Sequence, residues 1–202
     1  MNRRKFCKVI LGGTAAAFFL PGILLEDKIK KAAAAVSKKK ILIPQVKIRE
    51  TYLKFGYLEN RLSTDAIVIH HIGNTNADVS AATVHRWHLN NGWSGIGYHY
   101  LIRKNGVIER GRPRDTVGAH CYGYNDCTVG INVVGEFDSA VPTKAQMTSL
   151  TKLLAALCQL YQLYPTEDVI FGHRDFCNTA CPGDNLYARL PLIRKETKAL
   201  LN

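Results

Sequence analysis

The chain has 202 residues, a length that fits one domain with an additional segment. Its formal net charge of +11 at first suggests an affinity for nucleic acid. The charge is concentrated, however, because residues 1–47 hold 11 Lys and Arg against two acids, whereas residues 48–202 hold 16 against 14. The part of the chain that can form a core therefore lacks the basic face on which phosphate contacts depend, and we predict no nucleic-acid partner.

Residues 1–26 have the form of an export signal, in which basic residues precede a modest apolar run. The adjacent Arg3 and Arg4 resemble the pair of a twin-arginine signal. The alternative is a membrane anchor, since residues 9–25 reach the lower limit of a spanning helix, which is about 17 residues. The signal predicts an exported protein of the periplasm or cell envelope.

Residues 27–48 are a linker by composition, with a lysine-rich stretch and an alanine run. One interpretation is a solvated spacer. The other is attraction to anionic lipid, because basic clusters beside an apolar segment gain about 1 kcal/mol per charge at such a surface. Membrane contact is thus expected only through this N-terminal part, and residues 49–202 are expected to form the folded domain.

The first predicted strand, residues 66–69, is an apolar run rich in β-branched side chains that ends at His70 and His71. Asp78 or Ser80 can cap a helix that follows and extends to about residue 90. Three further strands are expected before the longest helix, at residues 98–103, 107–109 and 129–134. An Asn-Gly pair between the first two predicts a hairpin turn.

The longest predicted helix begins at Thr143, where Gln146 completes a capping box and leucines then recur at helical spacing. A short strand at residues 169–171 ends at a Gly-His pair, and residues 186–201 suit a terminal helix. This order of elements predicts an α/β fold with a mixed central β-sheet flanked by helices.

Two predicted strands end in histidine, at His70 and His173, and Cys181 follows eight residues after the second. Strand ends are where sheet proteins place their sites. Two imidazoles and a thiolate suit zinc, with a fourth position left for water. The alternatives are that His70 bonds to backbone and that Cys181 forms a disulfide with Cys177. Because strand neighbours point to opposite faces, only one of His70 and His71 is expected to face the site.

Other histidines and cysteines have simpler interpretations. His85 and His88 lie on the first predicted helix and are expected to pack, as is His99. Two cysteines flank a loop and can form a disulfide if the protein is exported, namely Cys121 and Cys127. Cys158 lies on the apolar side of the long helix and is expected in the core.

Short sequence blocks occur in order at residues 63–70, 87–88, 97–100, 118–120, 172–175 and 180–183. Together they resemble the type 2 zinc amidases that include phage lysozyme-amidases and animal peptidoglycan recognition proteins. The resemblance covers about residues 64–190. It implies a single domain of this family that uses Zn²⁺ to hydrolyse the amide bond between N-acetylmuramate and L-alanine. The implied partners are peptidoglycan or muropeptides.

Carried over by position, the metal ligands of the family fall on His70, His173 and Cys181. The resemblance implies a catalytic role for Tyr98 and makes Thr179 a second candidate donor. His120 lies in a loop that resembles the substrate cleft, with a surface histidine as the alternative. The competing function is a non-catalytic peptidoglycan-binding receptor. Such family members typically lack the ligand cysteine, so the intact set here favours the enzyme.

Overall fold

The computed structural model describes residues 46–202. The predicted export signal or anchor at residues 1–26 lies outside the described residues, as does all but the end of the predicted linker. At that end, Ile48 already pairs with Ile108 in the sheet. Within residues 46–202, no helix is both long enough and apolar enough to span a membrane.

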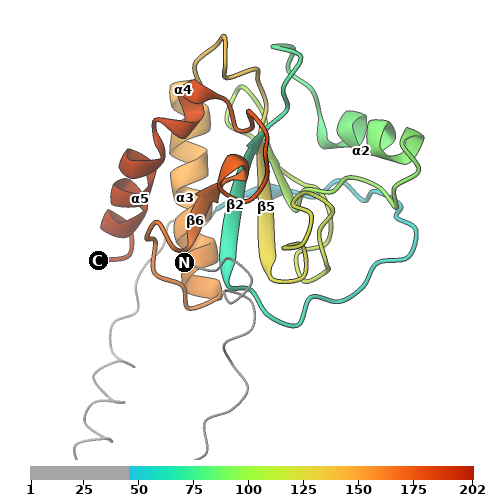
Figure 1. Cartoon of the computed structure of the whole chain (residues 1–202), viewed down its shortest axis with the longest axis horizontal. Helices are drawn as coiled ribbons and strands as arrows, with labels where there is room; N and C mark the ends of the chain where they lie inside the picture. The colour runs from blue at the N-terminus through green and yellow to red at the C-terminus, as the bar shows by residue number, and fades with distance from the viewer. Residues whose placement is uncertain (1–45) are drawn as a thin grey trace, which may run out of the picture. The chain divides into compact units, whose positions relative to one another are not determined.

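A six-stranded mixed sheet forms the centre of the folded unit (Figure 1), in the order β1-β4-β3-β5-β2-β6. The strands are β1 (Ile48–Arg49), β2 (Ala66–His71), β3 (Tyr100–Ile102), β4 (Ile108–Arg110), β5 (Thr128–Val133) and β6 (Ile170–Gly172). Strands β3 and β4 pair antiparallel, and the other pairs along this order are parallel. The predicted α/β fold with a mixed central sheet is therefore confirmed.

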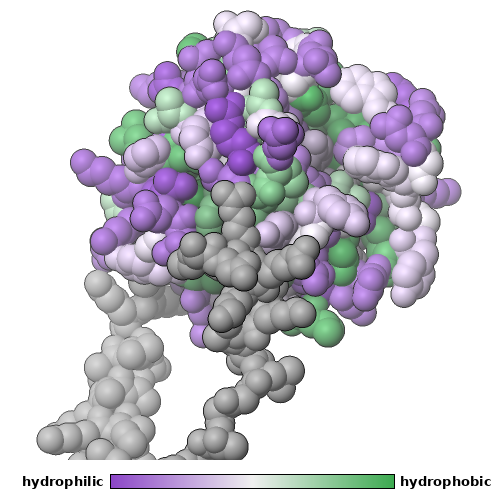
Figure 2. Space-filling view, viewed as in Figure 1, coloured by the Kyte–Doolittle hydropathy of each residue, from purple (hydrophilic) through white to green (hydrophobic). Residues whose placement is uncertain are grey.

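Both faces of the sheet are covered, which explains why every residue of β2 and β5 is buried. Helices α3 (Lys144–Leu160) and α5 (Leu190–Ala199) cover one face, and α2 (Ala81–Asn90) lies on the other side in Figure 1. The larger apolar cluster includes Ile67 and Ile69 with the buried leucines of α3, which are Leu150, Leu153, Leu154 and Leu157. A smaller cluster on the α2 side includes Leu101 and Val84. On the face shown in Figure 2, hydrophilic residues are interspersed with smaller hydrophobic areas, as is usual for a surface in water.

The helix boundaries follow from local chemistry. Ser80 is the N-cap of α2, because its side chain accepts the Thr83 N–H, whereas Asp78 accepts hydrogen bonds from Arg103. The predicted terminal helix is divided into α4 (Asp184–Tyr187) and α5. Proline stands in the first turn of α5, where its missing N–H costs nothing, so α5 begins at Leu190 rather than at residue 186.

The predicted capping box of α3 is present. The Thr143 side chain accepts the Gln146 N–H at 3.1 Å, and the Gln146 side chain accepts the Thr143 N–H at 3.0 Å. The Thr143 hydroxyl also donates to the Lys104 carbonyl at 2.8 Å, which ties the helix start to the turn between β3 and β4. This one side chain thus stabilises both a helix terminus and its attachment to the sheet.

Replacing Thr143 by Ala is expected to lower the free energy of unfolding by about 1–2 kcal/mol, because the cap and its hydrogen bonds are lost. Thermal unfolding should register this as a fall of about 2–4 °C per kcal/mol. Thr143→Ser, which keeps the hydroxyl, is the control and should lose little. An equal loss in both variants would mean that the methyl group, and not the cap, stabilises this corner.

Candidate functional site

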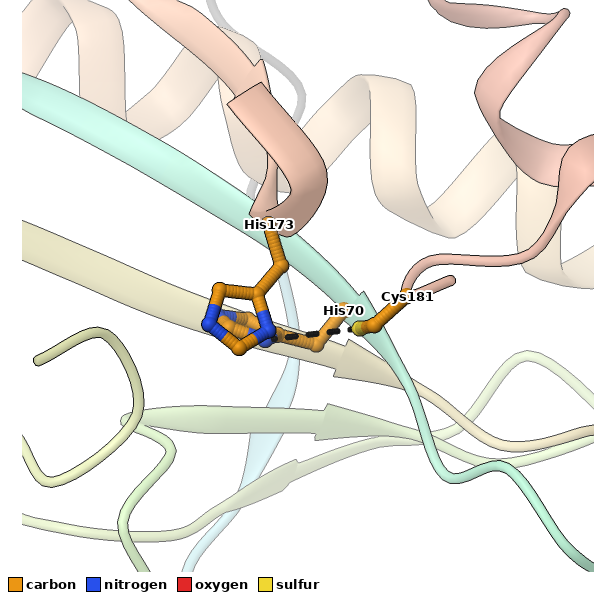
Figure 3. A group of neighbouring side chains, drawn as sticks. All are labelled: His70, His173 and Cys181. Atoms are coloured by element: carbon orange, nitrogen blue, oxygen red, sulfur yellow. Dashed lines mark hydrogen bonds between the residues drawn. The ribbon is translucent and has the colours of Figure 1, made fainter. Parts of the chain in front are cut away.

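The parallel pairing of β2 and β6 places two histidines at one edge of the sheet. Ile69 is paired with Gly172, so the chain reaches His70 and His173 at the same level. Their ring centroids are 4.5 Å apart. Cys181 comes from the loop after the 3-10 helix η2 (His173–Asp175), and its Sγ lies 3.7 Å from His70 Nδ1 (Figure 3). One ligand atom from each of the three side chains lies within 4.8 Å of the others.

The spacing of these donor atoms fits a zinc ion. Zn–N bonds of about 2.0–2.1 Å and Zn–S bonds of about 2.3 Å place tetrahedral ligand atoms roughly 3.5 Å apart. The 3.7 Å between His70 Nδ1 and Cys181 Sγ is close to that value. Nitrogen and thiolate sulfur are also the donor types that zinc prefers. The set is therefore suited to zinc in both geometry and chemistry.

The two adjacent histidines of β2 point to opposite faces, as predicted. His70 faces the α2 side, whereas the His71 ring contacts Phe137, a residue of the larger apolar cluster. His71 Nδ1 accepts the Phe137 N–H at 3.2 Å and lies 3.7 Å from Glu136 Oε1. The backbone N–H of His71 instead serves the site, because it donates to Cys181 Sγ at 3.4 Å.

The loop that carries Cys181 is held by the residues after His173. The Asp175 carboxylate accepts the Gly172 N–H at 2.9 Å and the Tyr187 hydroxyl at 2.6 Å. The Arg174 N–H donates to the Cys181 carbonyl at 2.9 Å. These bonds fix the path between the histidine and the cysteine, so Arg174 and Asp175 hold the site loop in place.

Burial controls the protonation of the three candidate ligands. It lowers the pKa of His70 well below the usual value, with further lowering by His120 and His173, and it also lowers the pKa of His173. Both imidazoles are therefore neutral near pH 7 and ready to bind a cation. Burial raises the pKa of the Cys181 thiol to about 12. Formation of its thiolate therefore requires a nearby positive charge such as a metal ion.

His120 supports the site from behind His70. Its Nδ1 lies 3.1 Å from His70 Nε2, the ring nitrogen that faces away from Cys181. Only 8% of His120 is exposed, so the alternative of a surface histidine is wrong. A Cβ at Gly130 in β5 would lie 2.5 Å from the His120 ring, which explains the glycine in that strand. A hydrogen bond to the second ring nitrogen is the usual way to orient a metal-binding histidine.

A cleft of about 550 Å³ opens beside these residues. Its lining includes Trp93, Tyr98, His120, His173, Cys177 and Thr179. The Tyr98 ring lies 5.1 Å from the His70 ring, and burial together with nearby Cys181 raises the pKa of its hydroxyl. This hydroxyl therefore remains a hydrogen-bond donor at neutral pH. Thr179 Oγ1 accepts the Cys181 N–H at 3.2 Å, so it also shapes the ligand loop.

The expected structural roles of the other histidines are confirmed. Each uses its Nδ1 to accept a backbone N–H: His85 from Ile96, His88 from Gly97 and His99 from Gly130. Cys158 is fully buried in the core, as predicted.

The cysteine pairings considered from the sequence are wrong. Cys121 is a free thiol, so it forms no disulfide with Cys127. Cys177 and Cys181 are also free, so the ligand set is intact. The near neighbours of Cys121 are instead His173 and Cys177, with all three donor atoms within 4.8 Å of one another.

One buried residue beside the site was missed in the sequence. Asn132 on β5 is fully buried and pairs in register with His70, so both side chains face the α2 side. Its amide acts on the Tyr98 hydroxyl, whose pKa it lowers against the effect of burial. Among the described residues, neither Nδ2 nor Oδ1 of Asn132 has a partner at a hydrogen-bonding distance and angle. The available signal was a polar residue within an otherwise apolar strand.

The buried histidines predict a loss of stability in acid. Burial lowers the pKa of His120 to about 3, from an unfolded value of about 6.5, so the unfolded chain binds more protons between these values. Stability should therefore be full above about pH 6.5 and fall as pH decreases, by up to about 1.4 kcal/mol per pH unit for each such histidine. Urea unfolding of chelator-treated protein at pH 7, 6 and 5 measures this slope, and His120→Gln should reduce it. A free energy independent of pH would contradict the buried neutral ring.

Comparisons with known proteins agree with this fold. The sequence pattern of the N-acetylmuramoyl-L-alanine amidase family matches residues 60–184. The endolysin of Escherichia phage T7 is 35% identical over 134 residues, which are 63% of this chain and 86% of the endolysin. The endolysin of Enterobacteria phage K11 is 38% identical over 113 residues, or 55% of this chain and 74% of that protein.

Solved structures show the same architecture. The N-acetylmuramoyl-L-alanine amidase LysC from Clostridium intestinale URNW is 37% identical, with a TM-score of 0.66 over 77% of this chain and 97% of LysC. A recognition-protein chain from the complex of tracheal cytotoxin with the peptidoglycan recognition proteins LCa and LCx is 28% identical to this chain. Its TM-score is 0.63, over 70% of this chain and 92% of that chain. The chain therefore belongs to the N-acetylmuramoyl-L-alanine amidase family, as a single domain of that fold.

Proposed function

We propose that this protein is a zinc-dependent amidase that hydrolyses the bond between N-acetylmuramate and L-alanine in peptidoglycan or muropeptides. The observation that carries the proposal is the set of His70, His173 and Cys181, whose donor atoms converge within 4.8 Å beside an open cleft. Three protein ligands leave a coordination position for water, as in catalytic zinc sites. Membership of the amidase family and similarity to phage endolysins support the same substrate class.

The chemistry supplied by a zinc ion in such a site is Lewis-acid activation of water and of the amide carbonyl. The two histidines can bind it without losing a proton, because their lowered pKa values keep them neutral. The Cys181 thiolate that forms on binding is stabilised by the His71 N–H. His120 holds the His70 ring through the nitrogen opposite the site, so that the ligand atom keeps its direction.

Tyr98 is assigned the role of hydrogen-bond donor to the oxygen on which negative charge develops. Its raised pKa keeps the proton on the hydroxyl, and its ring borders His70 in the cleft. Thr179 lines the same cleft and is assigned a second, weaker contact with the reacting group. His120 also lines the cleft, which supports a contact with stem peptide or glycan in addition to its contact with His70.

The proposal includes export, because the substrate lies in the cell envelope. The basic and apolar pattern of residues 1–26 supports it, and the lysines of residues 27–48 would favour an anionic membrane surface. Cell fractionation of the full chain with antibody detection would test it. Retention of the full-length protein in the cytoplasm would contradict export.

Incubation of the full chain with purified peptidoglycan should release stem peptides with a free L-alanine amine, detected by mass spectrometry. Chelation should abolish release and added zinc should restore it. Cys181→Ser should weaken zinc binding by at least about 10–100-fold, the loss typical of removing a partner of a metal ligand, as measured by metal analysis. Tight peptidoglycan binding by zinc-loaded protein without released peptide would instead identify a receptor, similar in role to the recognition proteins.

Tyr98→Phe is expected to reduce kcat by about 10²–10³-fold, the usual cost of losing one donor to the developing oxyanion. Zinc content should be unchanged, because the phenol is not assigned as a ligand. Tyr164→Phe is the matched control, since Tyr164 is 52% exposed and borders Lys198 on α5. A loss in substrate affinity with unchanged kcat would show that Tyr98 only binds the substrate.

A further inference from the structure

Two thiols that take no part in the proposed zinc set lie together in the wall of the cleft. Cys121 belongs to the loop between β4 and β5, and Cys177 follows η2. Both line the cleft and both are free thiols. Their Sγ atoms lie within 4.8 Å of each other and of a ring nitrogen of His173.

We propose that Cys121 and Cys177 are a redox pair that forms a disulfide across the wall of this cleft. Bonded sulfurs are about 2.05 Å apart, so the pair needs only a local change of side-chain rotamer and loop position. Cys177 has room for this change, because it is partly exposed in a loop. Cys121 is only 1% exposed and can serve as the fixed partner.

The other described thiols are less suitable partners. Cys158 is a residue of α3 and is fully buried in the core. Cys181 is held by the His71 N–H and lies 3.7 Å from His70 Nδ1, within the proposed zinc set. The grouping of Cys121 with Cys177 therefore allows oxidation of the cleft wall while the zinc ligands are retained.

The reaction requires an external disulfide, for which oxidised glutathione is a suitable chemical class in an oxidising compartment. The Cys177 thiolate, which is the more accessible, attacks one sulfur and forms a mixed disulfide while one glutathione thiolate leaves. Cys121 sulfur then displaces the second glutathione from Cys177. Two protein thiols and one external disulfide thus give one protein disulfide and two external thiols, with the two protons transferred to the leaving thiolates.

The bond would join two loops that are far apart in the sequence, one between β4 and β5 and the other after η2. The Cys121 loop carries His120, and the Cys177 loop lies between His173 and Thr179. A crosslink between them fixes the two loops at the cleft and lowers the conformational entropy of the unfolded chain. It also removes a second ligand set of Cys121, Cys177 and His173, which in the reduced protein shares His173 with the proposed zinc set.

The test uses the zinc-loaded full chain treated with oxidised glutathione, then alkylated and digested without reduction. We expect a crosslinked peptide that joins Cys121 to Cys177, and a Tm about 5–10 °C higher than that of the reduced protein. Cys121→Ser and Cys177→Ser should lose both effects, and Cys121→Ser should instead trap glutathione on Cys177. Cys158→Ala, which removes a buried thiol elsewhere, is the control and should keep the crosslink.

Three results would overturn the proposal. One is a crosslink from Cys177 to Cys181, and another is glutathione that remains on Cys177 while Cys121 is present. The third is protection of both thiols in zinc-loaded protein that ends on chelation, which would identify the pair as metal ligands. These readouts are covalent, so they do not depend on amidase activity and are separate from the tests of the proposed function.

Discussion

The register of three parallel strands is the constraint on which the rest of the site depends. Strand β2 lies between β5 and β6, and His70 is paired with Asn132 while Ile69 is paired with Gly172. A shift of one residue would turn His70 into the core beneath α3 and bring His71 to the cleft. The apolar alternation of β2 prevents this shift, because Ile67 and Ile69 fill the larger cluster. Hydrophobic burial on one face therefore aligns the donor atoms on the other.

Burial also sets the chemistry of the site. Four histidines lie close together, yet repulsion between charges does not arise, because burial lowers the pKa of each one and keeps it neutral: His70, His99, His120 and His173. The same burial keeps the Tyr98 hydroxyl protonated, and it keeps the proton on the Cys181 thiol until a cation is bound. The candidate ligands are therefore uncharged before a cation binds, and hydrogen bonds already hold the loop that carries Cys181. The cost is sensitivity to acid, which follows from the same lowered pKa values.

The cleft is built from loops rather than from the sheet, and this division has consequences for function. The histidines at the strand ends are held by the core, whereas Thr179 and the two wall cysteines belong to connecting segments. The solved amidase LysC and the solved recognition-protein chain both share the fold of this domain. Differences among them can therefore reside in the loops, where substitutions are tolerated without loss of the fold. Cys121 and Cys177 both belong to such loops.

Much of the fold was predictable because its signals are local. The β-branched run of β2 and the capping box of α3 each depend on a few neighbouring residues, and the structure has both at the predicted places. The boundary between α4 and α5 was less clear, because proline at a first turn and proline within a helix look alike in a pattern.

The sequence by itself determined the α/β class, the strand-end histidines and, through the family resemblance, the candidate set of His70, His173 and Cys181. Only the tertiary structure decided that Cys121 lies beside Cys177, that His120 is buried against His70, and that Asn132 faces Tyr98. The reason is physical. Strand and helix signals arise from residues a few positions apart, whereas these contacts join segments dozens of residues apart, and their geometry is set by sheet register and loop path.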